Sequence, residues 1–315
     1  MEKKTKIEFV LVSCCTYRRP KMLNTALDSI KKMKLPDNIR VEVLVVENDK
    51  EPLARDTVIA QMQTYPITLH YVQEKRAGIA NARNCVLYTA IELGASHIAF
   101  LDDDEIVDEN WLCSHIDFYQ NNHEAIIISG PTYNKFEKIY PDYIKNNNIF
   151  KQSTTKKTGM IRDICASGNV FFPVSITKED KIFFDAMYKY MGGEDGDFFS
   201  RASQQGYRIV WNNDAINYEI VDDSRANVKW ILNRYYYNGY SGVLLKLKKK
   251  PSSKVFYIIK NTVVLILNSI LVLPSLFFGL TCFLNALGLL FKTKGKLDAA
   301  IAGIPLNYYE NTSGC

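Results

Sequence analysis

The chain has 315 residues, of which 47% are hydrophobic, so it is long enough for one large α/β domain plus an appendage and too apolar for wholesale disorder. Its net charge of +5 is uneven, because lysines crowd residues 246–254 and 292–296 on either side of the most apolar stretch. That arrangement is typical of membrane flanks rather than of a nucleic-acid groove, so no nucleic-acid partner is expected. The seven cysteines include no CxxC pair, and the N-terminus lacks the apolar core of a secretory signal. Both features favour a reducing, cytoplasmic environment.

Strand-like and helix-like stretches alternate through the first half of the chain. Helical spacing of apolar residues after Pro20 predicts a first helix, and Ile79–Leu93 reads as a second that ends at Gly94. Short apolar runs predict strands at residues 9–14, 41–46, 67–72, 97–101 and 125–129. Alternation at this spacing favours an α/β fold with a mostly parallel, Rossmann-like sheet flanked by helices.

Polar clusters follow three of these predicted strands. They are residues 16–19 (TYRR), 47–49 (END) and 102–104 (DDD). Because ligands of parallel sheets bind beyond the carboxyl ends of the strands, these clusters are expected to converge on one site.

The acidic run Asp102–Glu105 comes directly after a buried strand. Adjacent carboxylates repel one another, and a hard cation such as Mg²⁺ or Mn²⁺ relieves that repulsion. Because Mg²⁺ commonly takes only one or two protein carboxylates and leaves the rest to phosphates, the run suggests a metal–diphosphate site. A solvated acidic turn is the alternative for this run alone. The chain has no GxxxxGK[ST] or GxGxxG motif, which argues against kinase, ATPase and dehydrogenase activity.

The second half of the catalytic region carries another acidic segment. Residues 131–165 read as a loop-rich insertion, and residues 167–173 as a short strand with a glycine turn. Residues 192–197 (GGEDGD) then lead into a helix. Acids at a helix start cap the helix dipole, but three acids after two glycines exceed what capping requires.

Five motifs in order make residues 7–242 resemble the family 2 glycosyltransferases of the GT-A fold. Residues 10–20 (VLVSCCTYRRP) resemble the opening strand and its TYNRP turn, and residues 43–48 (VLVVEN) the VVDN strand. Residues 78–84 (GIANARN) match GxxxARN, residues 100–104 (FLDDD) match the DXD motif, and residues 193–195 match the catalytic GED segment.

The resemblance implies a role for each matching residue. Asp195 would be the general base with Glu194 beside it, and Asp104 and Asp102 would be the metal ligands. The nucleotide-sugar contacts would come from Thr16, Tyr17, Arg19, Glu47, Arg83, Asp102 and Asp103, with Tyr17 and Glu47 at the base.

Two departures from the family pattern stand out. Glu47 replaces the usual Asp, and residues 217–221 (NYEIV) lack the His that many relatives place there. Glu219 is therefore a metal or acceptor contact or an ordinary surface residue.

The expected activity is inverting, metal-dependent, hexosyltransferase-like transfer of a sugar from a nucleoside-diphosphate-sugar to a hydroxyl. The acceptor would be lipid-linked or a surface glycan, as in polysaccharide biosynthesis. The alternative is a non-catalytic, membrane-attached sugar-nucleotide-binding scaffold.

The sequence divides into a GT-A catalytic domain (residues 1–242) and a membrane-associated helical region (residues 243–315). Residues 255–291 are long for one span and short for two full spans, which predicts a hydrophobic helical hairpin that turns near Pro274 and is either re-entrant or barely spanning. A single tilted helix and a buried helical pair are the alternatives. Flanking lysines would keep both ends cytoplasmic, which places the protein on the cytoplasmic face of the inner membrane.

Overall fold

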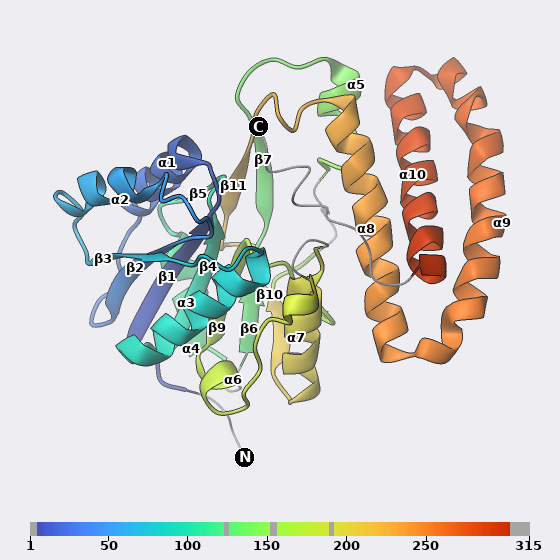
Figure 1. Cartoon of the computed structure of the whole chain (residues 1–315). Helices are drawn as coiled ribbons and strands as arrows, with labels where there is room; N and C mark the ends of the chain where they lie inside the picture. The colour runs from blue at the N-terminus through green and yellow to red at the C-terminus, as the bar shows by residue number, and fades with distance from the viewer. Residues whose placement is uncertain (1–4, 123–125, 152–155, 189–191, 303–315) are drawn as a thin grey trace. The chain divides into compact units, whose positions relative to one another are not determined.

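The computed structural model describes residues 5–122, 126–151, 156–188 and 192–302. In chain order the elements are β1 (Phe9–Thr16), α1 (Pro20–Ile30), β2 (Arg40–Glu47), α2 (Arg55–Met62), β3 (Leu69–Gln73), α3 (Ile79–Leu93), β4 (His97–Asp102), β5 (Glu105–Val107), α4 (Trp111–Gln120), β6 (Ile126–Ser129), β7 (Thr132–Phe136), α5 (Asp142–Lys145), β8 (Ile161–Arg162), β9 (Asn169–Pro173), α6 (Ser175–Lys178), η1 (Ala186–Tyr188), α7 (Glu194–Gln204), β10 (Arg208–Trp211), β11 (Asn217–Val221), α8 (Val228–Lys249), η2 (Pro251–Ser253), α9 (Lys254–Val272), η3 (Pro274–Phe278) and α10 (Leu280–Ala302) (Figure 1).

The chain forms two compact units, and the boundary between them falls within β7 and β11. Unit 1 holds residues 1–133, 153–189 and 194–220, and unit 2 holds residues 134–152, 190–193 and 221–315. The division expected from sequence, at residues 242/243, stays a prediction.

The main sheet of unit 1 confirms the expected α/β fold. Its eight strands lie in the order β3-β2-β1-β4-β9-β6-β10-β8. The first four run parallel, as do β6 and β10, whereas β9 is antiparallel to both of its neighbours and β8 is antiparallel to β10. A second sheet has three strands in the order β5-β11-β7.

Alternate residues of β1 feed two hydrophobic cores. Val10 and Val12 pack in the core that includes Leu27 of α1 and Trp111 of α4. Leu11 packs in the core that includes residues of α3 and α7. Because successive side chains of a strand point to opposite faces, the continuous apolar run of β1 marks a strand covered by helices on both sides.

The predicted helix Ile79–Leu93 matches α3 at both ends. Its C-cap is Gly94 in the left-handed conformation, with φ of 76°, and the Gly94 N–H bonds the carbonyl of Ile91. A glycine adopts this conformation without the steric cost that a Cβ brings, so the helix ends where the sequence indicated.

Unit 2 contains three long helices, and the predicted hairpin is present. The helices α9 and α10 meet at η3, which begins at Pro274. The helices α8 and α10 approach closely at Gly239. A Cβ added there would clash with the carbonyl oxygen of Lys292. Among the described residues, one helical stretch, Pro251–Val272, has the length and mean hydropathy (2.0) to cross a membrane.

Candidate active site

The sheet brings together the ends of three strands that the sequence singled out. In the parallel registers, Thr16 of β1 lies beside Glu47 of β2, and Cys15 of β1 lies beside Asp102 of β4. The polar residues that follow β1, β2 and β4 therefore gather at one edge, as expected for a ligand site of a parallel sheet.

Asp103 and Asp104 are buried at this edge. The hydroxyl of Thr16 donates to Asp103 Oδ2 at 2.8 Å, and Arg19 Nη1 donates to Asp104 Oδ2 at 2.8 Å and to Asp103 Oδ1 at 3.4 Å. Burial, and after it the charge of Asp104, raises the pKa of Asp103 to about 7. Two neighbouring carboxylates therefore contact the same guanidinium, and their mutual repulsion favours the protonated form of one of them.

Asp102 is the most accessible of the three aspartates, with 42% of its side chain exposed. One of its carboxylate oxygens lies 3.4 Å from Arg83 Nη2, while its backbone N–H donates to Glu105 Oε2 at 3.1 Å. Glu105 also accepts a hydrogen bond from Asn217 at 2.8 Å. Glu105, the fourth acid of the run, is thus buried and holds the backbone of Asp102 in place.

Gly168 is part of the same packing. A Cβ added at Gly168 would lie 2.6 Å from Glu105 Oε1 and 3.0 Å from Asp102 Oδ2. The glycine turn noted in residues 167–173 therefore leaves space for the acids that follow β4.

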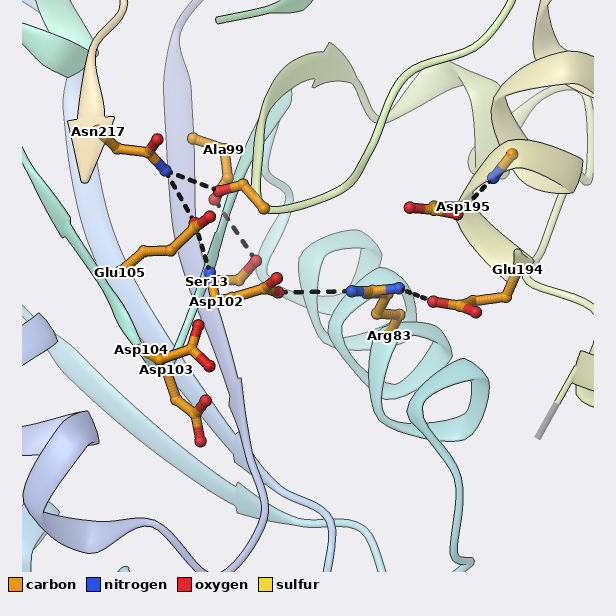
Figure 2. A network of polar contacts seen from close by, with 12 residues as sticks. Ser13, Arg83, Ala99, Asp102, Asp103, Asp104, Glu105, Glu194, Asp195 and Asn217 are labelled. Atoms are coloured by element: carbon orange, nitrogen blue, oxygen red, sulfur yellow. Dashed lines mark hydrogen bonds and ion pairs between the residues drawn. The ribbon is translucent and has the colours of Figure 1, made fainter. Parts of the chain in front are cut away.

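Arg83 joins the acids of β4 to the acidic segment of α7 (Figure 2). It is buried in the first turns of α3 and donates to Glu194 Oε1 through Nη1 and toward Asp102 through Nη2. Burial alone lowers the pKa of Arg83, but the carboxylates of Glu194, Asp102 and Asp195 outweigh it and hold the pKa above its ordinary value.

Glu194 is buried and incompletely bonded. Its Oε2 has no hydrogen-bond partner in the described structure. Burial raises its pKa to about 7; the guanidinium of Arg83 opposes this shift and the charge of Asp195 adds to it. Burial and the charge of Asp195 together therefore outweigh the guanidinium of Arg83, and the pKa of Glu194 is raised.

Asp195 lies in the first turn of α7 and is half-buried. Its Oδ1 accepts the backbone N–H of Gly196 at 2.7 Å, so part of the carboxylate serves the helix start. The next acid, Asp197, is held separately by Arg201 at 2.8 Å. Glu194 and Asp195 are neighbours on α7, and the bond from Arg83 to Glu194 connects this segment to the edge that carries Asp102.

The side chains that follow β1 and β2 have partners of their own. Glu47 is fully buried, with Oε1 accepting from the Ala54 N–H at 2.8 Å and Oε2 accepting from the Tyr71 hydroxyl at 2.6 Å. Tyr17 is half-buried, with the guanidinium of Arg18 5.0 Å from its ring centroid. The roles of all ten residues assigned from the sequence stay predictions.

Sequence reasoning assigned no individual role to two asparagines, Asn48 and Asn169, that the structure shows holding loops of unit 1. Asn48 donates to the carbonyls of Glu74 and Arg76 and accepts the N–H of Gly78, which fixes the entry into α3. An Asn directly after a buried strand was the available signal. Asn169 accepts from Trp111 Nε1 at 2.8 Å. Its Nδ2 donates to two main-chain carbonyls and to one side-chain oxygen within unit 1.

The acids at this edge fit a divalent cation that brings further ligands with it. In the described part of the chain, no three His, Cys, Asp or Glu side chains are grouped so as to hold a metal. Asp102 is accessible, and the raised pKa of Asp103 reports a carboxylate pair that an added positive charge would relieve. Carboxylate oxygens are the ligands that Mg²⁺ and Mn²⁺ prefer, and diphosphate oxygens complete such sites.

The fold and this edge define a GT-A-type glycosyltransferase. The chain resembles the solved mannosyltransferase PcManGT from Pyrobaculum calidifontis in complex with GDP-Man and Mn²⁺, with a TM-score of 0.60, 18% identity, and coverage of 97% of this chain and 79% of that one. It also resembles S. aureus TarS 1-349 in complex with UDP, with a TM-score of 0.54, 18% identity, and coverage of 93% and 91%.

The sequence gives the more specific assignment. The model of glycosyl transferase family 2 matches residues 12–180, so the chain belongs to that family and is a glycosyltransferase. A curated relative, the succinoglycan biosynthesis protein ExoM of Rhizobium meliloti (strain 1021), is 29% identical over 228 residues, which cover 72% of each chain. The family and fold expected from the five sequence motifs are confirmed.

Proposed function

We propose that the protein transfers a hexose from a nucleoside-diphosphate-sugar to a hydroxyl of a lipid-linked or surface glycan, with inversion. The observation that carries this is the Arg83 bridge, because it connects Asp102 after β4 with Glu194 beside Asp195. Donor-side and acceptor-side carboxylates thus belong to one network.

Asp102 and Asp104 would hold Mg²⁺ or Mn²⁺ against the donor diphosphate. The cation would stabilise the charge that develops on the leaving diphosphate. Arg19, already bonded to Asp104, would lie where a second positive charge can act on the same group.

Asp195 would take the proton of the acceptor hydroxyl as that oxygen attacks the sugar. Glu194 would support it indirectly. With a pKa near 7, Glu194 carries a proton for part of the time, which lowers the negative charge around Asp195. Tyr17 would pack against the nucleotide base. Glu47 would accept a hydrogen bond from the base only by giving up its bond with the Ala54 N–H or the Tyr71 hydroxyl.

Relatives support the substrate class. ExoM is described as acting in succinoglycan biosynthesis, and PcManGT is solved with GDP-Man and Mn²⁺. By analogy we expect a glycan acceptor and a metal-assisted sugar nucleotide. The proposed place on the cytoplasmic face of the cell membrane rests instead on the lysines that flank the apolar residues 255–291.

The test is Asp195→Asn with Asp163→Asn as its matched control, since Asp163 is an exposed aspartate of the same unit. Sugar nucleotide binding with Mn²⁺ is measured by calorimetry, and transfer by release of nucleoside diphosphate in membranes that contain the acceptor. We expect Asp195→Asn to bind donor within about twofold of wild type and to lose at least 100-fold in transfer. Full turnover by this variant would remove Asp195 from the proposed role.

A panel of sugar nucleotides identifies the donor. Donor binding by the wild type without release of nucleotide from any member, in the presence of acceptor membranes, would favour the scaffold over the enzyme.

A further inference from the structure

The outer face of α9 is apolar along the whole helix. Val255, Ile259, Val263, Ile266 and Ile270 follow one another at intervals of three or four residues, and each is more than half exposed. This spacing places them on one side of the helix. In η3, the turn that follows α9, Phe277 and Phe278 are 92% and 79% exposed.

The opposite side of α9 is attached to α10. The buried residues of α9 are Asn261 and Val272, and Asn268 Nδ2 donates to Thr293 Oγ1 of α10 at 3.0 Å. Figure 1 shows α10 between α8 and α9. The hydroxyl of Tyr236 on α8 in turn bonds Asp298 of α10 at 2.8 Å. The three helices of unit 2 therefore behave as one layer, with α9 at its edge.

This attachment argues against a membrane span by α9. Its 19 residues measure about 28 Å, close to the thickness of a hydrocarbon core, so length alone permits crossing. Crossing would take α10 to the same depth, including Lys292, Lys294 and Asp298. Charged side chains at that depth are strongly unfavourable, whereas an orientation along the membrane surface keeps them outside it.

The charges near α9 suit an anionic surface. Residues 246–260 hold six lysines, and residues 225–297 contain no Asp or Glu. Burial lowers the pKa of Lys296. The positive charges of Lys292, Lys246 and Lys260 lower it further, which shows that lysines from all three helices gather in one region. Clustered lysines beside an apolar helix are typical of binding to anionic lipid headgroups.

We propose that α9 lies flat in one leaflet of an anionic phospholipid bilayer, with its outer face and the Phe277–Phe278 turn inserted and the lysines at the headgroups. This inference rests on the membrane attachment proposed above and adds the residues and the orientation. The protein then contacts one leaflet and does not cross the bilayer.

Attachment is tested by flotation of the full chain with vesicles of phosphatidylcholine, with or without 30% phosphatidylglycerol as roughly the anionic fraction of a bacterial surface. Ile266→Glu should weaken binding at least tenfold, and the matched control Ile139→Glu should leave it unchanged, since Ile139 is 98% exposed elsewhere in unit 2. Replacing the exposed Lys249, Lys250 and Lys254 by Gln should weaken binding to the anionic vesicles about fivefold per lysine, and should leave binding to neutral vesicles unchanged.

Orientation is tested by quenching with lipids brominated at different depths. Tryptophan is placed singly at Val255, Val263 and Ile270 of the outer face, and the signal of the parent protein is subtracted. A flat helix predicts the same shallow depth at all three positions, about 5–10 Å below the headgroups. A deep centre at Val263 with shallow ends would overturn the flat orientation in favour of a span.

Two other outcomes would also overturn the inference. Absence of vesicle binding by the wild type would remove the bilayer as the occupant. An oligomer in solution that dissociates on Ile266→Glu, without vesicle binding, would assign the outer face to a second copy of the chain. Neither result bears on sugar nucleotide binding by unit 1, which is measured without vesicles, so failure here and failure of the transferase proposal are distinguishable.

Discussion

Replacing Arg83 by Met removes a buried positive charge from between Asp102 and Glu194. Removing one partner of a buried ion pair costs about 3–5 kcal/mol, because the remaining charge is left buried. In a domain of this size that lowers Tm by roughly 6–20 °C. The cost should grow as pH rises, because Glu194 without Arg83 has a still higher pKa and its ionisation opposes folding more strongly.

The measurement is thermal unfolding followed by circular dichroism between pH 5 and about 8.5, the range in which a group titrating near 7 changes charge. Lys34→Met is the control, because it removes an exposed ion pair. The side chains of Lys34 and Glu109 are 62% and 69% exposed, so their pair should contribute less than about 1 kcal/mol to stability. Adding Glu194→Gln to Arg83→Met should restore about 1–3 kcal/mol, since the uncompensated carboxylate is gone. An Arg83→Met variant as stable as Lys34→Met at every pH would refute the account of the bridge.

Four further results are expected. Glu194→Gln should become more stable than wild type as pH rises from about 4.5 to about 7, by about 3 kcal/mol at most. The reason is that the folded pKa of Glu194 is raised to about 7, so the wild type loses stability as Glu194 ionises. A difference in unfolding free energy that does not change with pH would contradict this. Gly168→Ala should destabilise the folded protein by about 1–3 kcal/mol and reduce transfer, because the new Cβ displaces the Glu105 carboxylate. Unchanged unfolding curves would show that this carboxylate can move away freely. Asn169→Leu should cost about 1–3 kcal/mol by leaving the Trp111 N–H and its neighbours unpaired, which chemical denaturation will measure. Chelation with EDTA should stop nucleotide release and added Mn²⁺ should restore it, whereas activity in EDTA would rule out a required metal.

Hydrophobic pattern predicted the elements of unit 1 well, because buried parallel strands and their covering helices leave a strong local signal. The β1, β2, β4 and α3 ranges agree with the expected ones within two residues. The antiparallel insertion of β9 between β4 and β6 left no comparable signal, because strand order depends on contacts between distant parts of the chain.

The same limit applies to the site. The motifs identified Arg83, Asp102 and Glu194 separately, but the bridge that Arg83 makes depends on how α3 lies beside α7 in the folded unit. Glu105 read as one more acid of a cluster, and only the fold shows it buried against Asn217 and the backbone of Asp102.

For unit 2, apolar length predicted the hairpin but not its packing. Apolar length does not identify Gly239, which the structure places against the backbone of α10. Length and hydropathy describe α9 as a span, whereas its hydrogen bond to Thr293 attaches it to charged helices. Whether α9 could cross a membrane therefore depends on tertiary contacts that composition does not encode.

A crystal structure with a nucleoside diphosphate and Mn²⁺, with the metal located by its anomalous signal, tests the donor site most directly. The account predicts manganese about 2–2.5 Å from a carboxylate oxygen of Asp102 or Asp104, with the diphosphate on its other side and the base near Tyr17. A nucleotide bound away from the end of β4, or bound there with manganese absent at saturating concentration, would contradict it.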